Sequence, residues 1–419
     1  MSELILTLRR PAQVGDKARS DFVLSTRDNL PGTVVRGAFA AAWIARNAAP
    51  APGAPLRAEF MRLFEGDVRY GALLPHGLET SPLSVVSHKY QPSEQCAEAE
   101  YDQAAQDSVP VSCPDCGSPL EQSRALRGDG HPVLVQRRTS VVISPSGVAS
   151  RGQIVTRDTL AAGQAFRGTL VASDPALLGV LADLGQVRVG GRRTTHGAAD
   201  VRIEDGQDPP AAERRQDGRL ILRLRSPGIF TDDQGRPARE PNAAELQDVL
   251  GCPVRVARRW ARWHTVGGWH VASGLPKPAE VAVAAGSTYL LEPSAPVPDA
   301  AVAELGRRGL GLRRHEGFGD LASPPRLVPG RHARQAEEDR LRGLMNLVAP
   351  LRGLQVTSGQ DWAALTTLLT AHASGDATAA ASLTRMAERF DPWIRQAIAD
   401  FLRLAAADAA YVAGELRRP

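Results

Sequence analysis

The sequence predicts an α/β protein made of two copies of one module, followed by a helical region. Three observations support this fold class. A strand pattern at the N-terminus recurs after residue 216, and a segment rich in glycine and arginine closes each copy. The C-terminal residues carry apolar side chains at helical spacing. We therefore expect modules at 1–210 and 216–328, an insertion at 88–132 in the first module, and a helical region at 331–419.

The opening strands of the two modules are nearly identical. Residues 4–11 read LILTLRRP, and residues 220–227 read LILRLRSP. Apolar and polar residues alternate after an apolar start in both segments, which is typical of a strand with one buried face.

Two further segments recur in the same order. Residues 187–197 (VRVGGRRTTHG) correspond to residues 310–319 (LGLRRHEGFG), and both contain an Arg-Arg pair between glycines. Upstream of these, a turn followed by a strand is expected at 163–170 and again at 286–291. Three matched elements in one order favour duplication over chance similarity of a single strand.

The insertion contains a candidate metal site. Residues 113–117 read CPDCG within a polar, acidic stretch, and such a knuckle presents two thiolates from one small turn, as tetrahedral zinc requires. We expect a structural Zn²⁺ held by Cys113 and Cys116, with Cys96 and His88 as the nearest further ligands; His131 and Cys252 are the alternatives. Metal-free thiols or a redox pair would also fit the CxxC, although no strand precedes it as in a thioredoxin-like site.

The C-terminal region is expected to form four helices, at 336–349, 362–373, 379–389 and 392–416. Gly375 and Pro392 separate neighbouring apolar-periodic stretches. The region could pack on the second module or dock a partner, and the sequence does not decide between these roles.

The composition predicts a soluble, cytoplasmic protein. The 419 residues are 43% hydrophobic and 23% charged, which is enough apolar mass for more than one core. No apolar run approaches the roughly 20 residues of a membrane helix, and the N-terminus lacks the order of a signal peptide. Four cysteines exclude a disulfide scaffold.

Arginine dominates the basic residues. The chain has 50 basic and 46 acidic residues, and its lysines are Lys17, Lys89 and Lys277. Arginine binds phosphate through a bidentate fork and stacks on bases, although a genome of high GC content would also produce this bias. A modest net charge of +4 with local basic clusters suits RNA contact in a groove rather than nonspecific polycation binding.

Several segments together resemble the RAMP superfamily of CRISPR-associated proteins. Residues 30–40 (LPGTVVRGAFA) are similar to the start of that family's first helix, and residues 64–71 with Pro75 and 81–84 resemble the following strand and proline-rich stretch. With the two glycine-rich segments, the resemblance covers about residues 1–325. The CxxC insertion is similar to that of the large tandem-RAMP subunit of type III-D effector complexes.

This resemblance implies two tandem ferredoxin-like, or RRM-like, domains, each with a glycine-rich loop after its last helix. It also implies an RNA-binding subunit of a type III effector complex in antiviral defence. Such a subunit holds the repeat-derived 5′ handle of the crRNA near the target RNA. Its partners would be the large polymerase-like subunit, the backbone RAMP subunits and the small subunit.

The candidate RNA-binding residues come from three places. Helix amides and a basic side chain at the start of the first helix could hold a phosphate, and glycine loops leave amide donors free beside their arginines. A cluster of tryptophan and arginine at 258–270 would stack on bases, form core on one helical face, or contact a partner subunit. The residues are Arg36, Arg192, Arg193, Thr194, His196, Arg262, Trp269, Arg313, Arg314 and His315.

We expect the protein to be noncatalytic. Some RAMP proteins are endoribonucleases that process CRISPR RNA through a histidine acting as general acid or base. This chain has histidines at 88, 196, 264, 270 and 315, but none lies in a Ser-His-Asp or HExxH arrangement. An endoribonuclease and a protein-interaction scaffold without RNA contact are the two alternatives.

Overall fold

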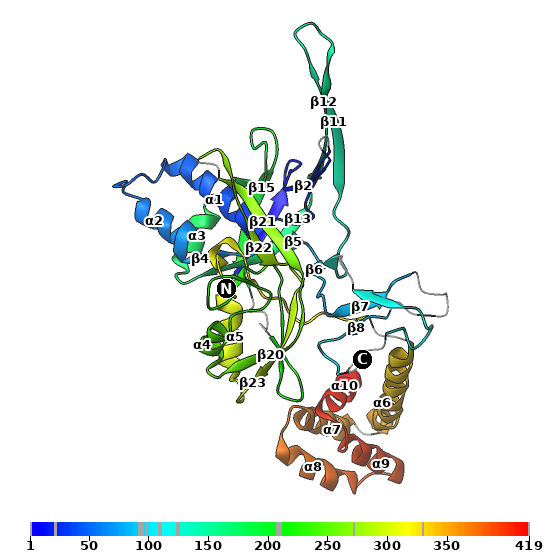
Figure 1. Cartoon of the computed structure of the whole chain (residues 1–419). Coiled ribbons are helices and arrows are strands. Elements are labelled where there is room, and N and C mark those ends of the chain that lie inside the picture. Colours follow the sequence, from blue (N-terminus) through cyan, green and yellow to red (C-terminus); the bar gives the residue numbers. More distant parts are fainter. Residues whose placement is uncertain are drawn as a thin grey trace. The chain divides into compact units, whose positions relative to one another are not determined.

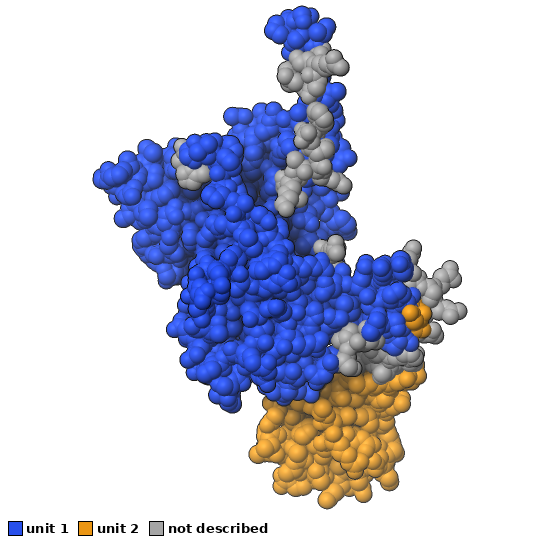
Figure 2. Space-filling view, in the orientation of Figure 1, with its two compact units in different colours: residues 1–91, 100–114, 118–328 blue, residues 92–99, 115–117, 329–419 orange. Residues whose placement is uncertain are grey.

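The computed structural model of the chain describes residues 2–20, 23–90, 96, 99–107, 111–122, 126–206, 212–270, 273–328, 331–357 and 359–417. These residues form two compact units. Unit 1 comprises residues 1–91, 100–114 and 118–328, and unit 2 comprises residues 92–99, 115–117 and 329–419 (Figure 2). Strands and helices mix in the first unit and helices make up most of the second (Figure 1). The predicted mixed α/β class and the C-terminal helical region are confirmed.

The first sheet of unit 1 has the order β14-β15-β1-β13-β4, and β5 also pairs with β13. Every neighbouring pair in it is antiparallel. Helices α1 (Gly32–Asn47) and α3 (Ala176–Ala182) contribute to its core. The strands are β1 (Ser2–Leu8), β4 (Val68–Tyr70), β5 (Leu74–Pro75), β13 (Ala165–Ala172), β14 (Gln186–Arg188) and β15 (Ala198–Asp205).

Successive side chains of β1 point to opposite faces of this sheet. Leu4, Leu6 and Leu8 are fully buried in the core beneath the helices, whereas Glu3 and Thr7 lie on the opposite face and are half-buried. Helix α1 begins directly after Pro31, where a fixed φ suits a helix start. We call the face away from the helices the open face.

The second sheet of unit 1 has the order β16-β17-β23-β20, again all antiparallel. Helix α4 (Ala243–Leu250) is capped by the side chain of Asn242, which accepts the amide of Ala244 at 2.8 Å, and it ends at Gly251 with φ 76°. Helix α5 (Asp299–Arg308) packs into the same core. The strands are β16 (Ala212–Arg214), β17 (Leu220–Arg223), β20 (Val254–Trp260) and β23 (Thr288–Pro293).

The two glycine loops share one backbone hydrogen-bond pattern. In each, the residue before the first glycine bonds the carbonyl of the last glycine, and the loop also bonds the segment that follows the opening strand. Arg192 and Arg313 occupy the same place and both have positive φ, 51° and 55°. The matched amide-to-carbonyl bonds are Val189 to Gly197 and Leu310 to Gly319, Gly191 to Gln13 and Leu312 to Ile229, and Gly197 to Pro11 and Gly319 to Pro227.

Each sheet carries a two-stranded ribbon inserted before its β13 or β23 strand (Figure 1). The first ribbon pairs β11 (Val135–Ile143) with β12 (Ala149–Leu160). Strand β12 also pairs in parallel with β3 (Val23–Thr26), which pairs with β2 (Gly15–Ser20). The second pairs β21 (Trp263–His270) with β22 (Leu275–Val283).

The insertion forms a small sheet of its own, with the order β8-β7-β9. Its strands are β7 (Val85–His88), β8 (Tyr101–Asp102) and β9 (Leu120–Gln122). The remaining short elements of unit 1 are α2 (Arg57–Met61), η1 (Arg62–Gly66), β6 (Glu79–Thr80), β10 (Leu126–Arg127), β18 (Phe230–Thr231), β19 (Pro237–Ala238) and η2 (Arg314–Glu316).

Unit 2 contains five helices within the described residues. They are α6 (Arg331–Thr357), α7 (Gly359–Ala373), α8 (Ala377–Ala387), α9 (Pro392–Phe401) and α10 (Ala406–Arg417). The expected single helix at 392–416 is wrong, because the chain turns after Phe401 and both halves bury apolar residues in one core. Among the described residues, no helix is long and apolar enough to span a membrane.

Candidate functional site

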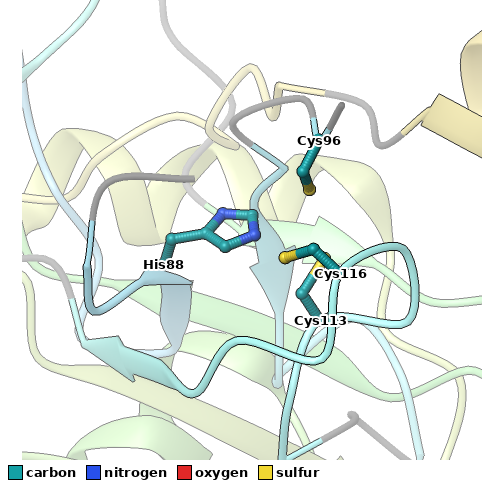
Figure 3. Close-up of side chains that lie close together, drawn as sticks. All are labelled: His88, Cys96, Cys113 and Cys116. Carbon is teal, nitrogen blue, oxygen red and sulfur yellow. The ribbon is translucent and has the colours of Figure 1, made fainter. Parts of the chain in front are cut away.

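The structure brings the four predicted metal ligands together. His88, at the end of β7, and the thiols of Cys96, Cys113 and Cys116 offer donor atoms that all lie within 4.8 Å of one another. Figure 3 shows the three thiols and the imidazole directed toward a common centre. Cys113 is buried and the other three are half-buried.

Local backbone structure holds these ligands in place. Gly117, directly after the second knuckle cysteine, has φ 71°, a conformation that favours glycine. The Cys113 amide donates to the Ser118 carbonyl at 2.8 Å, which closes the turn. Because β9 follows this turn and pairs Leu120 with His88, the register of the small sheet brings the imidazole to the knuckle.

The donor set fits a tetrahedral zinc ion. Three thiols and one imidazole form a closed structural site, and Zn–S bonds of about 2.3 Å place sulfur atoms about 3.8 Å apart around the ion. Donor atoms within 4.8 Å need little adjustment to reach this geometry. The cluster could therefore hold a metal ion, and the identity of the ion as zinc stays a prediction.

The two alternative ligands do not join this group. Cys252 is buried in the core of the second sheet, where its thiol donates to the Ala295 carbonyl at 3.7 Å. His131 is exposed and lies outside the cluster.

The first glycine loop offers its arginines to solvent. Arg192 is exposed and Arg193 is half-buried, and no ion pair of either is found among the described residues. Thr194 is exposed, and the neighbouring Thr195 hydroxyl lies 2.8 Å from the Nδ1 atom of His196. This loop therefore presents positive charge and a ring together.

The second glycine loop uses its charges inside the protein. Arg313 bonds Glu316 at 2.7 Å and Glu280 at 2.9 Å, and its guanidinium lies 4.9 Å from the ring centre of Phe318. Arg314 contacts Glu245 at 3.5 Å. The sequence predicted two equivalent loops, but the structure pairs the arginines of the second one with acids.

The electrostatics of the second loop follow from this network. Burial alone would raise the pKa of Glu316. The hydrogen bond from Arg313 and the positive charges of Arg313, Lys277 and Arg36 have the larger effect and lower this pKa to about 2. Burial lowers the pKa of His315, and the positive charge of Arg36 lowers it further. Glu316 is thus a carboxylate and His315 a neutral ring at neutral pH.

Arg36 is also engaged within the protein. Its guanidinium donates to the Phe64 carbonyl and pairs with Glu65. The start of α1 is covered, because a Cβ at Gly32 would lie 2.1 Å from the Tyr70 carbonyl oxygen. A phosphate held by the first amides of this helix would have to displace these contacts.

The tryptophan and arginine cluster lies on strands, so the interpretation of a helical face is wrong. Trp260, at the end of β20, is 9% exposed and donates to the Gln103 side chain at 2.6 Å. Trp263 and Trp269, on β21, are 44% and 60% exposed. Arg262 donates to the Gln122 side chain, and the described structure does not include the side chain of His270. One tryptophan is therefore core, and the other two are available for contacts.

The insertion covers the open face of the second sheet, which the sequence did not indicate. Leu83 and Ala104 from the first module's chain pack with Ile221, Leu290 and Trp260. A buried ion pair of 2.5 Å joins Arg223 of β17 to Asp102 of β8, with side chains 1% and 2% exposed. The central strands β17 and β23 are therefore covered on this face.

Part of the chain matches a known family model. Residues 171–322 match the model of the CRISPR-associated protein family Cas_Cmr3. The matched stretch contains both glycine loops, β17, β23 and the second ribbon. The chain matches no curated protein sequence.

Several solved structures are similar at low identity. A chain of a type III-B Cmr-beta complex bound to target RNA and AMPPnP is 12% identical, with a TM-score of 0.41 and coverage of 69% of this chain and 86% of that chain. A chain of a type III-A Csm3–Csm4 subcomplex is 12% identical (TM-score 0.33, 72% and 96% covered), and a CRISPR-associated Cas6 protein is 10% identical (TM-score 0.32, 77% and 99% covered). These similarities are too low to decide fold or function.

Proposed function

We propose that this chain is a noncatalytic, RNA-binding subunit of a type III CRISPR effector complex. In this role it holds the repeat-derived 5′ handle of the crRNA and docks the large subunit and the backbone subunits. The observation that carries the proposal is the Cas_Cmr3 match over residues 171–322, because it spans both glycine loops.

The strand order supports two ferredoxin-like modules. In the first sheet the chain runs β1, α1, β4, β13, α3, β15, and the strands lie side by side as β15-β1-β13-β4. This is a β-α-β-β-α-β unit with its last strand beside its first, as in ferredoxin-like folds. The second sheet repeats the central pair as β17 beside β23.

We infer that RNA contact in the loops falls mainly to the first one. Arg192 and Arg193 have no acidic partner among the described residues, so their charges are available to phosphates. Arg313 would have to leave two carboxylates before it could bind RNA. Trp269, 60% exposed on β21, is the second candidate contact, through stacking on an unpaired base.

The metal would act structurally. His88 and the three cysteines fill all four positions of a tetrahedral ion, which leaves none for substrate. When bound, the ion would fix the turn before β9 and so support the small sheet that packs against the second module. The CxxC insertion is also the feature that favours subtype III-D.

The endoribonuclease alternative would rest on His315. This neutral ring lies 3.8 Å from Glu316, and Arg36 exerts its charge on it. A neutral imidazole that can accept a proton, next to a carboxylate and a cation, is compatible with a general base. Cleavage of 5′-labelled repeat RNA by the purified protein, abolished in His315→Ala or His196→Ala, would replace the noncatalytic assignment.

Binding of repeat-derived RNA should be measured by fluorescence anisotropy from low to moderate salt. The variant Arg192→Ala/Arg193→Ala should weaken binding and reduce the salt slope by about one per lost phosphate contact. The matched control, Arg385→Ala/Arg403→Ala, removes two exposed arginines from unit 2 and should retain wild-type affinity.

An unchanged affinity and slope in the loop variant would refute the loop's role. A scaffold without RNA contact predicts no binding by any of these proteins. Copurification of RNA with a coexpressed complex separates that alternative from a subunit that binds only when assembled.

A further inference from the structure

The duplication places two equivalent arginines in different electrostatic settings. Arg9 and Arg225 each follow the opening strand of their module, and their amides donate to equivalent carbonyls, those of Ala198 and Asp320. Arg9 forms an ion pair with Asp200, two residues beyond Ala198. The corresponding place beyond Asp320 is taken by Ala322, so the second module has no acid there.

Arg225 is directed to a cavity on the open face of the first sheet. The cavity has a volume of about 490 Å³, all within unit 1. Register places Glu3 opposite Thr169 and Ile5 opposite Arg167, on the side of the sheet away from the core leucines. The lining residues that bear on the argument are Ser2, Glu3, Arg167, Thr169, Asp205 and Arg225.

Arg225 and Arg167, which line this cavity, each have a buried N–H donor that lacks a hydrogen-bond acceptor within the described structure. The Nε atoms of Arg225 and Arg167 are buried and have no hydrogen-bond partner among the described residues. One terminal nitrogen of Arg225 donates to the Arg167 carbonyl at 3.3 Å. Burying a guanidinium donor unpaired is unfavourable, so these groups are suited to an acceptor brought by a ligand.

The less exposed part of the cavity carries the positive charge of Arg225. Arg167 is neutralised by Glu3 at 3.2 Å, whereas no ion pair of Arg225 is found in the described part of the chain. Glu79 and Asp205 also line the cavity, but both are exposed residues, and water screens their charges. An anion would therefore be attracted to Arg225, with carboxylates left at the margin.

We propose that this cavity binds one ribonucleotide, with its phosphate on Arg225. The volume lies in the range of small-ligand sites, roughly 300–1,000 Å³, and suits one nucleotide. The carboxylate of Glu3 and the hydroxyls of Ser2 and Thr169 can accept hydrogen bonds from ribose hydroxyls, which distinguishes RNA from DNA. If the nucleotide is part of a bound RNA strand, the inference rests on the proposed function. A free mononucleotide would offer the same phosphate and ribose hydroxyls.

The test compares Arg225→Gln with Arg9→Gln, the equivalent substitution in the other module. Titration with each of the four nucleoside monophosphates, by calorimetry and by NMR, is the first arm. Anisotropy with repeat-derived RNA and with its DNA counterpart is the second. We expect Arg225→Gln to weaken binding of the monophosphate or RNA at least tenfold, and Arg9→Gln to remain within twofold of wild type.

A measurement on wild-type protein keeps the test independent of the variant's folding. RNA containing 4-thiouridine should crosslink to the peptide around residues 75–79, which lines the cavity. Crosslinks there assign the site to an RNA strand, while monophosphate binding without them assigns it to a free nucleotide. Wild-type protein that binds no monophosphate and yields no crosslink at 75–79 overturns the proposal. RNA binding that still depends on Arg192 and Arg193 would then leave the proposed function intact.

Discussion

Breaking the buried ion pair between Arg223 and Asp102 should release the insertion from the second sheet. The pair is 2.5 Å long, with side chains only 1% and 2% exposed. Replacing Asp102 with Ala leaves the guanidinium buried with Glu213 as its remaining acid. The loss of one partner of a buried pair typically costs about 3–5 kcal/mol, which corresponds to a fall in Tm on the order of 10 °C.

Differential scanning calorimetry of a double-mutant cycle is the appropriate assay. Asp102→Ala and Arg223→Met should each destabilise strongly, and the double variant should lose less than the sum of the two, because no buried charge is left unpaired. The exposed pair Arg255–Glu292 is the control, since its removal should cost at most about 1 kcal/mol. If the buried single variants behave like this control, the insertion does not cover the second sheet as described.

Three further predictions concern the metal, a helix start and acid stability. Purified protein should contain about one zinc per chain by elemental analysis, and Cys113→Ser should lose it; metal-free wild-type protein that is fully folded would contradict the assignment. Gly32→Ala should lower Tm sharply because its Cβ would lie 2.1 Å from the Tyr70 carbonyl oxygen, whereas Gly37→Ala, on the same helix with open space, should be neutral or slightly stabilising. Folded Glu316 has a pKa of about 2 against 4.5 when unfolded, so the unfolded chain binds more protons between these values and stability falls as pH falls. Glu316→Gln should flatten this slope in acid titrations, and an unchanged slope would exclude the ion-pair network as its source.

Local signals in the sequence predicted the parts of the site that depend on nearby residues. The CxxC knuckle needs only one turn, and His88 and Cys96 lie in the same short insertion, so the ligand group was accessible from spacing. The Gly-Arg-Arg repeat similarly predicted matched loops, because both backbones need glycine and a left-handed residue at the same places.

Features set by distant residues were not predictable. The roles of the two loops differ because Glu316, within the second loop, and Glu280, on β22, neutralise Arg313. Nothing in the loop motif specifies the acid on β22. Asp102 and Arg223 are 121 residues apart, and neither lies in a motif that indicates their pairing. The helical face expected at Trp260 is a strand in the structure, because a short basic-aromatic run has no period long enough to separate a strand from a helix.

Sequencing of copurified RNA tests the central proposal most directly. The tagged chain would be coexpressed with the other subunits of a type III complex and a CRISPR array, and the RNA bound to it recovered after ultraviolet crosslinking. The proposed function predicts crRNA species that share a repeat-derived 5′ end, with crosslinked peptides from the loop at residues 190–197. RNA at the level of an untagged control, or crosslinks to the spacer alone, would contradict it.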